Sequence, residues 1–209
     1  MRQSRVTGIA CGVAARGWPR TRAAEPALTL LPPPTPRTAQ YETDVSLPMY
    51  AMGPGVPAGA ILEYPTTHID ITATIVELAG ATAAGPPLDG LSFAAAFSAS
   101  PPAPRAWRDF QFAEFHCNDL TWRQVRRPFE NTTYAMWCDG TEEVFDLVAD
   151  PWQLANVAAT SGANISAADG PLAEAMWTCS GDACRAPTPR AVTPFRCYNV
   201  SGPMAEFDP

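Results

Sequence analysis

The sequence offers few side chains that could carry out chemistry, and these are widely spaced. His68 and His116 are its only histidines, and neither is accompanied by a nucleophile motif that would complete a catalytic triad. Cys179 and Cys184 have no partner ligands at the spacing of a zinc site. A phosphate-binding glycine loop is also absent from the sequence. These residue types by themselves predict no complete catalytic or metal centre.

The cysteines and glycosylation motifs indicate an oxidising compartment on the secretory pathway. The chain has six cysteines, an even number. N-glycosylation motifs of the Asn-x-Ser/Thr type occur three times, at Asn131, Asn164 and Asn199. Each lies in a segment that reads as loop or tail, so all three predict exposed acceptors in a secreted glycoprotein.

Two disulfides are expected. A Ser-Gly-Asp-Ala turn can bring Cys179 to Cys184, and so small a closed loop contributes about 2 kcal/mol by chain entropy. Cys117 and Cys138 could close a hairpin, which by the same reasoning contributes roughly 3 kcal/mol. The remaining pair, Cys11 and Cys197, has no assigned role.

Residues 1–28 form an arginine-rich leader with no acidic residue before Glu25. Their apolar stretch at 6–15 is interrupted by glycines, and its flank does not fit a cleavage site, so they make a poor secretory signal. A transit peptide and unrelated sequence joined upstream are the alternatives. The secretory prediction therefore depends on the cysteines and the glycosylation motifs.

The first half of the remaining chain predicts one strand and one helix. Residues 47–52 are apolar and end at a Gly-Pro-Gly turn, which is typical of a short buried strand. Residues 71–79 carry apolar side chains near helical spacing, with Asp70 as the expected N-cap and Gly80 at the C-terminal end.

The second half predicts a small antiparallel sheet followed by two helices. Aromatic and β-branched runs at 110–115, 122–126, 134–138 and 144–147 are separated by turn residues, of which Asp139-Gly140 is the strongest hairpin motif. Asp150-Pro151 predicts the start of a helix at 151–158, and a second helix is expected at 169–178.

Twenty-three prolines mark the boundaries between these parts. They divide the chain into the leader at 1–28, an α/β segment at 29–97, a proline-rich linker at 98–105, an antiparallel subdomain at 106–185 and a proline-rich tail at 186–209. No apolar run approaches the roughly 20 residues of a membrane-spanning helix. All 14 basic residues are arginine and the net charge is −7, which disfavours nucleic-acid binding.

Four sequence blocks occur in the order typical of one enzyme family. They are Tyr-Glu-Thr-Asp with Gly-Pro-Gly at 41–56, Ile-Asp to Ala-Gly at 69–80 followed by Leu-Asp-Gly-Leu-Ser-Phe at 88–93, Glu-Glu-Val-Phe-Asp-Leu with Asp-Pro and Asn at 142–156, and Cys-Ser-Gly-Asp-Ala-Cys-Arg at 179–185. Together they resemble the later part of a sulfatase catalytic domain, over about residues 29–187. The last block is most similar to the N-acetylglucosamine-6-sulfatase and algal-type arylsulfatase branch.

The resemblance implies an α/β fold of the alkaline-phosphatase-like superfamily, with this chain as a C-terminal fragment of it. That fragment would comprise the end of the catalytic domain and a small antiparallel sheet-and-helix subdomain. The full-length family hydrolyses sulfate esters of sugars or aryl groups with calcium and a formylglycine made from the cysteine of Cys-x-Pro-x-Arg. Neither that motif nor its paired metal-binding aspartates occur in the sequence. No residue is therefore assigned to catalysis or metal binding, no cofactor is expected in this chain, and the chain alone is expected to be inactive.

The resemblance also supplies candidates for the rim of a substrate site. A Gly-Lys-Arg segment precedes the Tyr-Glu block in sulfatases, and here Pro36 falls on its lysine and Arg37 on its arginine. Proline cannot hold a sulfate oxygen. Arg37, His68 and His116 remain as rim candidates for a sulfated glycan or aryl sulfate.

A non-catalytic function is the alternative prediction. The chain could be a secreted glycoprotein fragment that binds a sulfated glycan or a protein partner through its small sheet. The proposed contacts in that case are Trp122, Arg123, Arg126 and Trp137.

Overall fold

The computed structural model describes residues 40–82, 85–98, 100–116 and 121–193. In chain order the elements are α1 (Glu42–Val45), α2 (His68–Leu78), the 3-10 turn η1 (Ala94–Phe97), α3 (Pro104–Trp107), β1 (Gln111–Phe115), β2 (Trp122–Arg127), β3 (Thr132–Trp137), β4 (Glu142–Asp146), α4 (Ala163–Thr178) and α5 (Asp182–Arg185). The leader at 1–28, Arg37, Cys117 and Asn199 lie outside the described residues.

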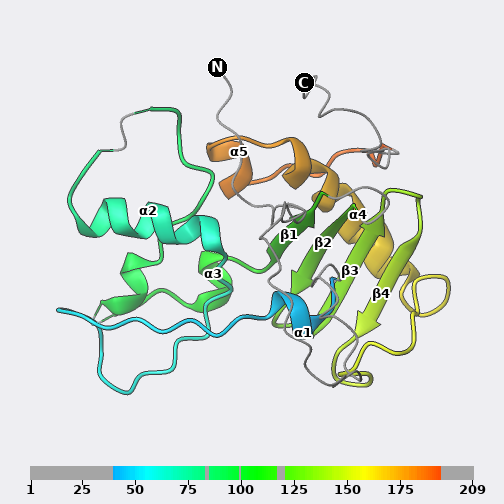
Figure 1. Ribbon diagram of the computed structural model, residues 1–209, viewed down its shortest axis with the longest axis horizontal. Helices are drawn as coiled ribbons and strands as arrows, with labels where there is room; N and C mark the ends of the chain where they lie inside the picture. Colours follow the sequence, from blue (N-terminus) through cyan, green and yellow to red (C-terminus); the bar gives the residue numbers. More distant parts are fainter. Residues whose placement is uncertain (1–39, 83–84, 99, 117–120, 194–209) are drawn as a thin grey trace, which may run out of the picture.

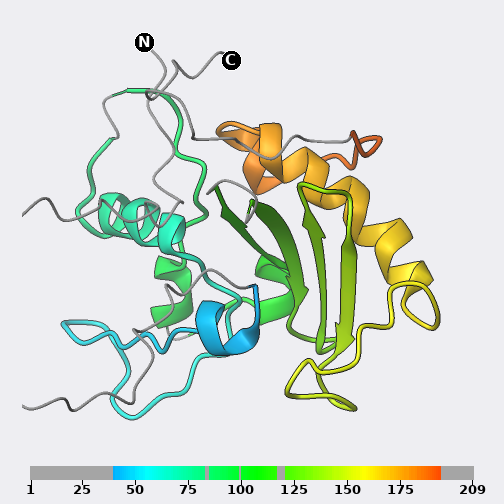
Figure 2. The ribbon, with the colours of Figure 1, turned by 45° about the vertical axis from the view of Figure 1, so that its right-hand side comes forward.

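The four strands form one antiparallel sheet in the order β1-β2-β3-β4, as the aromatic and β-branched runs predict. The Asp139-Gly140 turn joins β3 to β4: Gly140 has a φ of 87°, and the Asp139 carboxylate accepts a hydrogen bond from the Thr141 N–H at 2.8 Å. Figures 1 and 2 show α4 along one face of this sheet and α1 on the other.

The core of the molecule lies between the sheet and α4. Side chains from β2, β3 and β4 point toward the helix, among them the fully buried Val125, Tyr134 and Val144. Leu172 and Met176 of α4 fill the space above them. The sequence predicts this helix only from residue 169, but it begins at Ala163, because its first two turns are polar and pack through little more than Ile165.

The helix predicted at 71–79 is present as α2, but its capping differs from the expectation. Thr67 is the N-cap, and Asp70 occupies the third helical position, where its carboxylate accepts hydrogen bonds from the Thr67 N–H at 2.7 Å and the Thr67 hydroxyl at 3.0 Å. Gly80 follows the helix with a φ of 59°, the left-handed conformation expected there.

Two predicted elements are wrong. Residues 47–52 form no strand: they run as extended, largely exposed chain, with Tyr50 92% and Met52 95% exposed. Residues 151–158 form turns rather than a helix. Gln153 there has a φ of 55°, which is incompatible with an α-helix, and the Asp150 carboxylate holds the Ala155 N–H at 2.8 Å.

The proline-rich segment predicted as a linker at 98–105 leads into α3, which begins at Pro104. In Figure 1, α2 and α3 lie beside the β1 edge of the sheet. The Arg108 guanidinium, just after α3, donates two hydrogen bonds of 2.7 and 2.9 Å to the Asp70 carboxylate of α2, and these connect the two helices. None of the described helices is long and apolar enough to cross a lipid bilayer.

Candidate functional site

The end of β1 and the end of α4 bring together an aromatic and charged cluster around His116. The His116 ring stacks on the Trp177 ring with centroids 4.3 Å apart and an interplanar angle of 16°. The Arg123 guanidinium lies over the same indole, 3.8 Å from its centroid. His116 Nε2 is also 3.8 Å from a carboxylate oxygen of Glu114. Its imidazole is thus held in one orientation while its side chain stays 34% exposed.

A buried ion pair supports this cluster from beneath. Arg123, which is 1% exposed, donates to a Glu174 carboxylate oxygen at 2.6 Å. The other oxygen of Glu174 accepts the Thr193 hydroxyl at 2.7 Å. Burial lowers the pKa of Arg123, and Glu174 opposes that shift by favouring the charged guanidinium. The pair therefore fixes β2 to α4 directly under the His116–Trp177 stack.

The other rim candidates do not join this cluster among the described residues. His68 is exposed at the first turn of α2, an element separate from β1. Arg37 lies outside the described residues, so its predicted position stays a prediction. Among the described rim candidates, His116 is thus the one that is oriented by an aromatic stack and a nearby carboxylate.

The contacts proposed for the alternative function are not one surface. Arg123 points toward α4 and is buried, whereas Trp122, Arg126 and Trp137 lie on the face that carries α1. Trp122 is 4% exposed and stacks on Phe115 with ring centroids 6.1 Å apart. These four side chains cannot all contact one partner from the same face, because neighbouring residues of a strand point to opposite faces.

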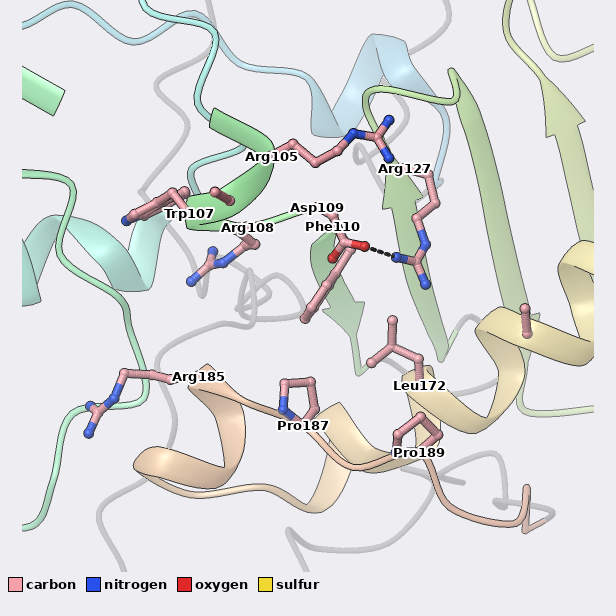
Figure 3. Close-up of a pocket in the computed structure, with 12 residues that line it drawn as sticks. Arg105, Trp107, Arg108, Asp109, Phe110, Arg127, Leu172, Arg185, Pro187 and Pro189 are labelled. Carbon is pink, nitrogen blue, oxygen red and sulfur yellow. Dashed lines mark hydrogen bonds and ion pairs between the residues drawn. The ribbon is translucent and has the colours of Figure 1, made fainter. Parts of the chain in front are cut away.

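A second candidate is a pocket of about 370 Å³ between α3, the start of β1, α4 and the chain after α5. Four arginines line it, but each is already paired with a carboxylate. Arg127 lies 2.9 Å from Asp109 and 2.8 Å from Asp169, and Arg108 binds Asp70. In Figure 3, the Arg105 and Arg185 side chains point away from the centre of the pocket; their partners are Glu130 and Asp182. The pocket is therefore close to neutral rather than strongly positive.

No local sequence motif indicates these arginine pairs. Asp70 and Arg108 are separated by 38 residues, and Arg127 and Asp169 by 42. Asp169 is buried, which raises the pKa of its carboxyl group, and Arg127 opposes that shift. Pairs that form across so many residues have no local sequence pattern that could predict them.

Two of the six cysteines form the disulfide expected from their spacing. Cys179 and Cys184 are bonded, with their Cα atoms 5.0 Å apart. Cys138 is also in a disulfide, but Cys117 lies outside the described residues, so the pairing of these two stays a prediction.

The described residues provide no calcium site. They contain no group of three or more aspartate, glutamate, histidine or cysteine side chains arranged to hold a metal ion. The buried carboxylates of Asp70 and Asp169 are engaged by arginines instead of pointing toward a shared centre. The cation that the resemblance implies for the full-length family does not fit this part of the chain.

Asn131 and Asn164 are expected to carry N-linked glycans if the chain passes through the secretory pathway. Both are exposed, Asn131 in the β2–β3 turn with a φ of 52° and Asn164 in the first turn of α4. Treatment with an amidase that removes N-glycans should convert both residues to aspartate, which peptide mass spectrometry detects. Unmodified asparagine at both positions in secreted material would contradict the prediction.

Comparison with curated proteins identifies the relatives of this chain, although no protein-family model matches it. Sulfatase ppz1 of Metarhizium majus is 29% identical over 180 residues, which covers 84% of this chain and 39% of the relative. N-acetylglucosamine-6-sulfatase of Bos taurus is 25% identical over 210 residues, covering 84% of this chain and 35% of the relative. Arylsulfatase K of Mus musculus is 29% identical over 130 residues, which covers 58% of this chain and 23% of the relative.

Solved structures give weaker likenesses. The phosphonate monoester hydrolase of Agrobacterium radiobacter is 25% identical, with a TM-score of 0.46 over 53% of this chain and 24% of that one. BT4656, solved in complex with its substrate D-glucosamine-2-N,6-O-disulfate, is 16% identical, with a TM-score of 0.39 over 50% of this chain and 22% of that one.

The sequence matches show that this chain is a homologue of sulfatases. It spans between 23% and 39% of the length of the curated relatives that it matches.

Proposed function

We propose that this chain is the C-terminal portion of a sulfatase that hydrolyses a sulfate ester on a sugar or aryl group, and that the chain alone is inactive. The match to sulfatases over 84% of this chain, but 39% or less of each relative, supports this proposal. Sulfate-ester hydrolysis needs an activated nucleophile and groups that stabilise the charge developing on oxygen. The sequence contains no Cys-x-Pro-x-Arg motif and no lysine.

The part that this chain would contribute is a surface for the substrate. His116 is the candidate contact, because its stacking on Trp177 and its proximity to Glu114 orient a partly exposed imidazole. Such a ring can donate a hydrogen bond to a sulfate or sugar oxygen. The nucleophile and the calcium ligands would have to come from residues outside those described, and we assign no step of the reaction to them.

A secretory compartment fits this proposal. The Cys179–Cys184 disulfide and the disulfide at Cys138 support it, because disulfides form and persist mainly in oxidising compartments. The extracellular space or a lysosome-like organelle is therefore the expected location of the mature chain.

The purified chain is expected to show no turnover of 4-methylumbelliferyl sulfate or 4-nitrocatechol sulfate above a buffer control. The reason is the missing formylglycine motif, since the described residues offer no other activated nucleophile. The assay should be run with and without added calcium, alongside an active sulfatase as the positive control. A calcium-dependent rate that saturates with substrate would show that the chain is an enzyme by itself.

A further inference from the structure

A buried amide and a partly buried carboxylate meet beneath α1. Gln40, the residue two positions before α1, is 0% exposed, and its side-chain Nε2 donates a hydrogen bond to the Glu143 carboxylate on β4. The Gln40 backbone carbonyl accepts a hydrogen bond from the Gln124 side-chain amide at 2.5 Å. The same amide nitrogen donates to the Thr133 hydroxyl at 2.8 Å. The entrance to α1 is thus attached to the sheet by these polar contacts, beside the edge-on contact of the Tyr41 ring with Phe145 on β4.

The Gln40 side chain has one polar atom that these contacts leave unsatisfied. Its Oε1 is buried and accepts no hydrogen bond from the described residues. An ionised Glu143 cannot help, because a carboxylate only accepts hydrogen bonds. A protonated Glu143 can donate its O–H to Gln40 Oε1 and still accept from Nε2, which closes a ring of two hydrogen bonds. Rotating the amide by a half turn does not remove this need, since Oε1 would then face the carboxylate directly.

The surroundings of Glu143 also favour the proton. Burial raises the pKa of its carboxyl group, while the N–H groups of Trp137 and Gln40 oppose the shift. The Asp139 carboxylate in the β3–β4 turn raises the pKa further, and Glu143 in turn raises the pKa of Tyr41. The cation on this face, Arg126, is paired instead with Glu42 at 2.9 Å.

We propose that Gln40 and Glu143 form an acid-strengthened latch that holds α1, and with it the start of the exposed segment 46–62, on the sheet when Glu143 carries a proton. The latch concerns the conformation of this chain and does not depend on the sulfatase assignment.

The direction of the pH dependence follows from proton linkage. Glu143 has a higher pKa when the latch is closed and buries it than when the latch is open and water reaches it. The closed state is therefore favoured most below the pKa of the open state, which is about 4.3 for an exposed glutamate. This advantage is lost as the pH rises through the higher pKa of the closed state. The closed-to-open ratio changes about tenfold for each unit that separates the two pKa values.

A second set of contacts at the start of α1 does not involve Glu143. The Glu42 N–H donates to the Gln153 side-chain oxygen at 2.7 Å, and Arg126 binds the Glu42 carboxylate. They hold α1 in place independently of Glu143. Removing the Arg126–Glu42 ion pair therefore weakens the attachment of α1 without changing the Glu143 carboxyl group, which makes it a suitable control.

Hydrogen exchange of the full chain tests the latch. Protection of peptides covering residues 40–46 should be measured by mass spectrometry at about pH 5 and about pH 8, on either side of the range in which a raised glutamate pKa falls. Exchange should be corrected for its intrinsic pH dependence, and peptides from α4 serve as the internal reference. We expect protection at 40–46 to fall several-fold between the two pH values while protection of α4 stays constant.

Glu143→Gln is the deciding variant. A carboxamide both donates and accepts, as the protonated acid does, so this variant should keep the acid-level protection at both pH values. Arg126→Gln is the matched control: it should lower protection at both pH values but leave the pH dependence in place. The same pH dependence in Glu143→Gln as in the unmutated chain would overturn the proposal, as would weaker protection of that variant at the lower pH.

A second measurement uses the unmutated chain, so its result does not depend on whether a variant folds. Titration of the Glu143 side-chain carboxyl by NMR in the unmutated chain should give a midpoint above that of exposed glutamates. A midpoint at or below about 4.3, the value for an exposed glutamate, would overturn the proposal whatever the exchange data show.

Discussion

Replacing Asp70 with alanine is expected to lower the unfolding free energy of the part that contains α2 and α3 by about 3–5 kcal/mol. The Asp70 side chain is 0% exposed and holds Arg108 through two oxygens at 2.7 and 2.9 Å. It also accepts the Leu91 N–H at 2.8 Å and caps α2 through Thr67. Its removal leaves a largely buried guanidinium without a counter-charge and two backbone groups without partners.

Urea unfolding followed by tryptophan fluorescence measures this effect. Trp107 is a suitable reporter, because its indole N–H donates to the Ser92 carbonyl at 2.9 Å and its ring lies beside the Arg108 guanidinium. Asp182→Ala is the matched control: it also removes an aspartate from an arginine pair, but that carboxylate is 90% exposed, so no measurable change is expected. A loss for Asp70→Ala no larger than that of the control would contradict the structural role assigned to the buried pair.

Limited proteolysis is expected to cut the chain first within residues 46–63. Tyr50, Met52 and Ile61 are 90% exposed or more, and the described backbone of 47–63 makes one backbone hydrogen bond, from the Val56 N–H to the Gly53 carbonyl. Protease sites need such an exposed, locally unpaired backbone. The next cut should fall in the proline-rich stretch around 98–105, and the resistant product should begin near Ala106.

The resistant product should persist because its sheet, α4 and the Cys179–Cys184 disulfide close on one another. N-terminal sequencing and intact mass of the fragments identify the cuts, and the time course gives their order. The same digestion under reducing conditions is the control for the contribution of the disulfides. A protected stretch at 46–63, or a uniformly resistant chain, would show that this segment already has its packing partner.

The small sheet could be predicted strand by strand from the sequence. Runs such as the one at Trp122–Arg127 alternate between side chains for two faces, and Asp139-Gly140 supplies the backbone conformation that a tight hairpin requires. These are local properties: the pleat and the turn depend on neighbouring residues. The α2 helix was predictable for the same reason, although its cap moved from Asp70 to Thr67, because Asp70 also accepts hydrogen bonds from distant groups.

The wrong predictions share a physical cause. The apolar residues at 47–52 have the composition of a strand, but a strand exists only where another strand pairs with it, and the described residues supply none. Asp150-Pro151 has the composition of a helix start, yet the Gln153 side chain is buried under α1, where it accepts the Glu42 N–H, and the chain there forms turns. In both cases a tertiary partner, present or absent, decided the conformation.

The candidate site divides in the same way. The sequence alone determined that His116 follows a strand, that Cys179 and Cys184 can be bridged, that no formylglycine motif is present, and that the chain resembles sulfatases, because these depend on residue identity and short spacing. Only the tertiary structure decided that His116 stacks on Trp177, that Arg123 is buried against Glu174, and that Glu143 meets Gln40. All three contacts join residues that lie between 51 and 103 positions apart in the sequence. They form because packing the sheet between α1 and α4 removes water from both faces and leaves each buried polar group to find its partner within the protein.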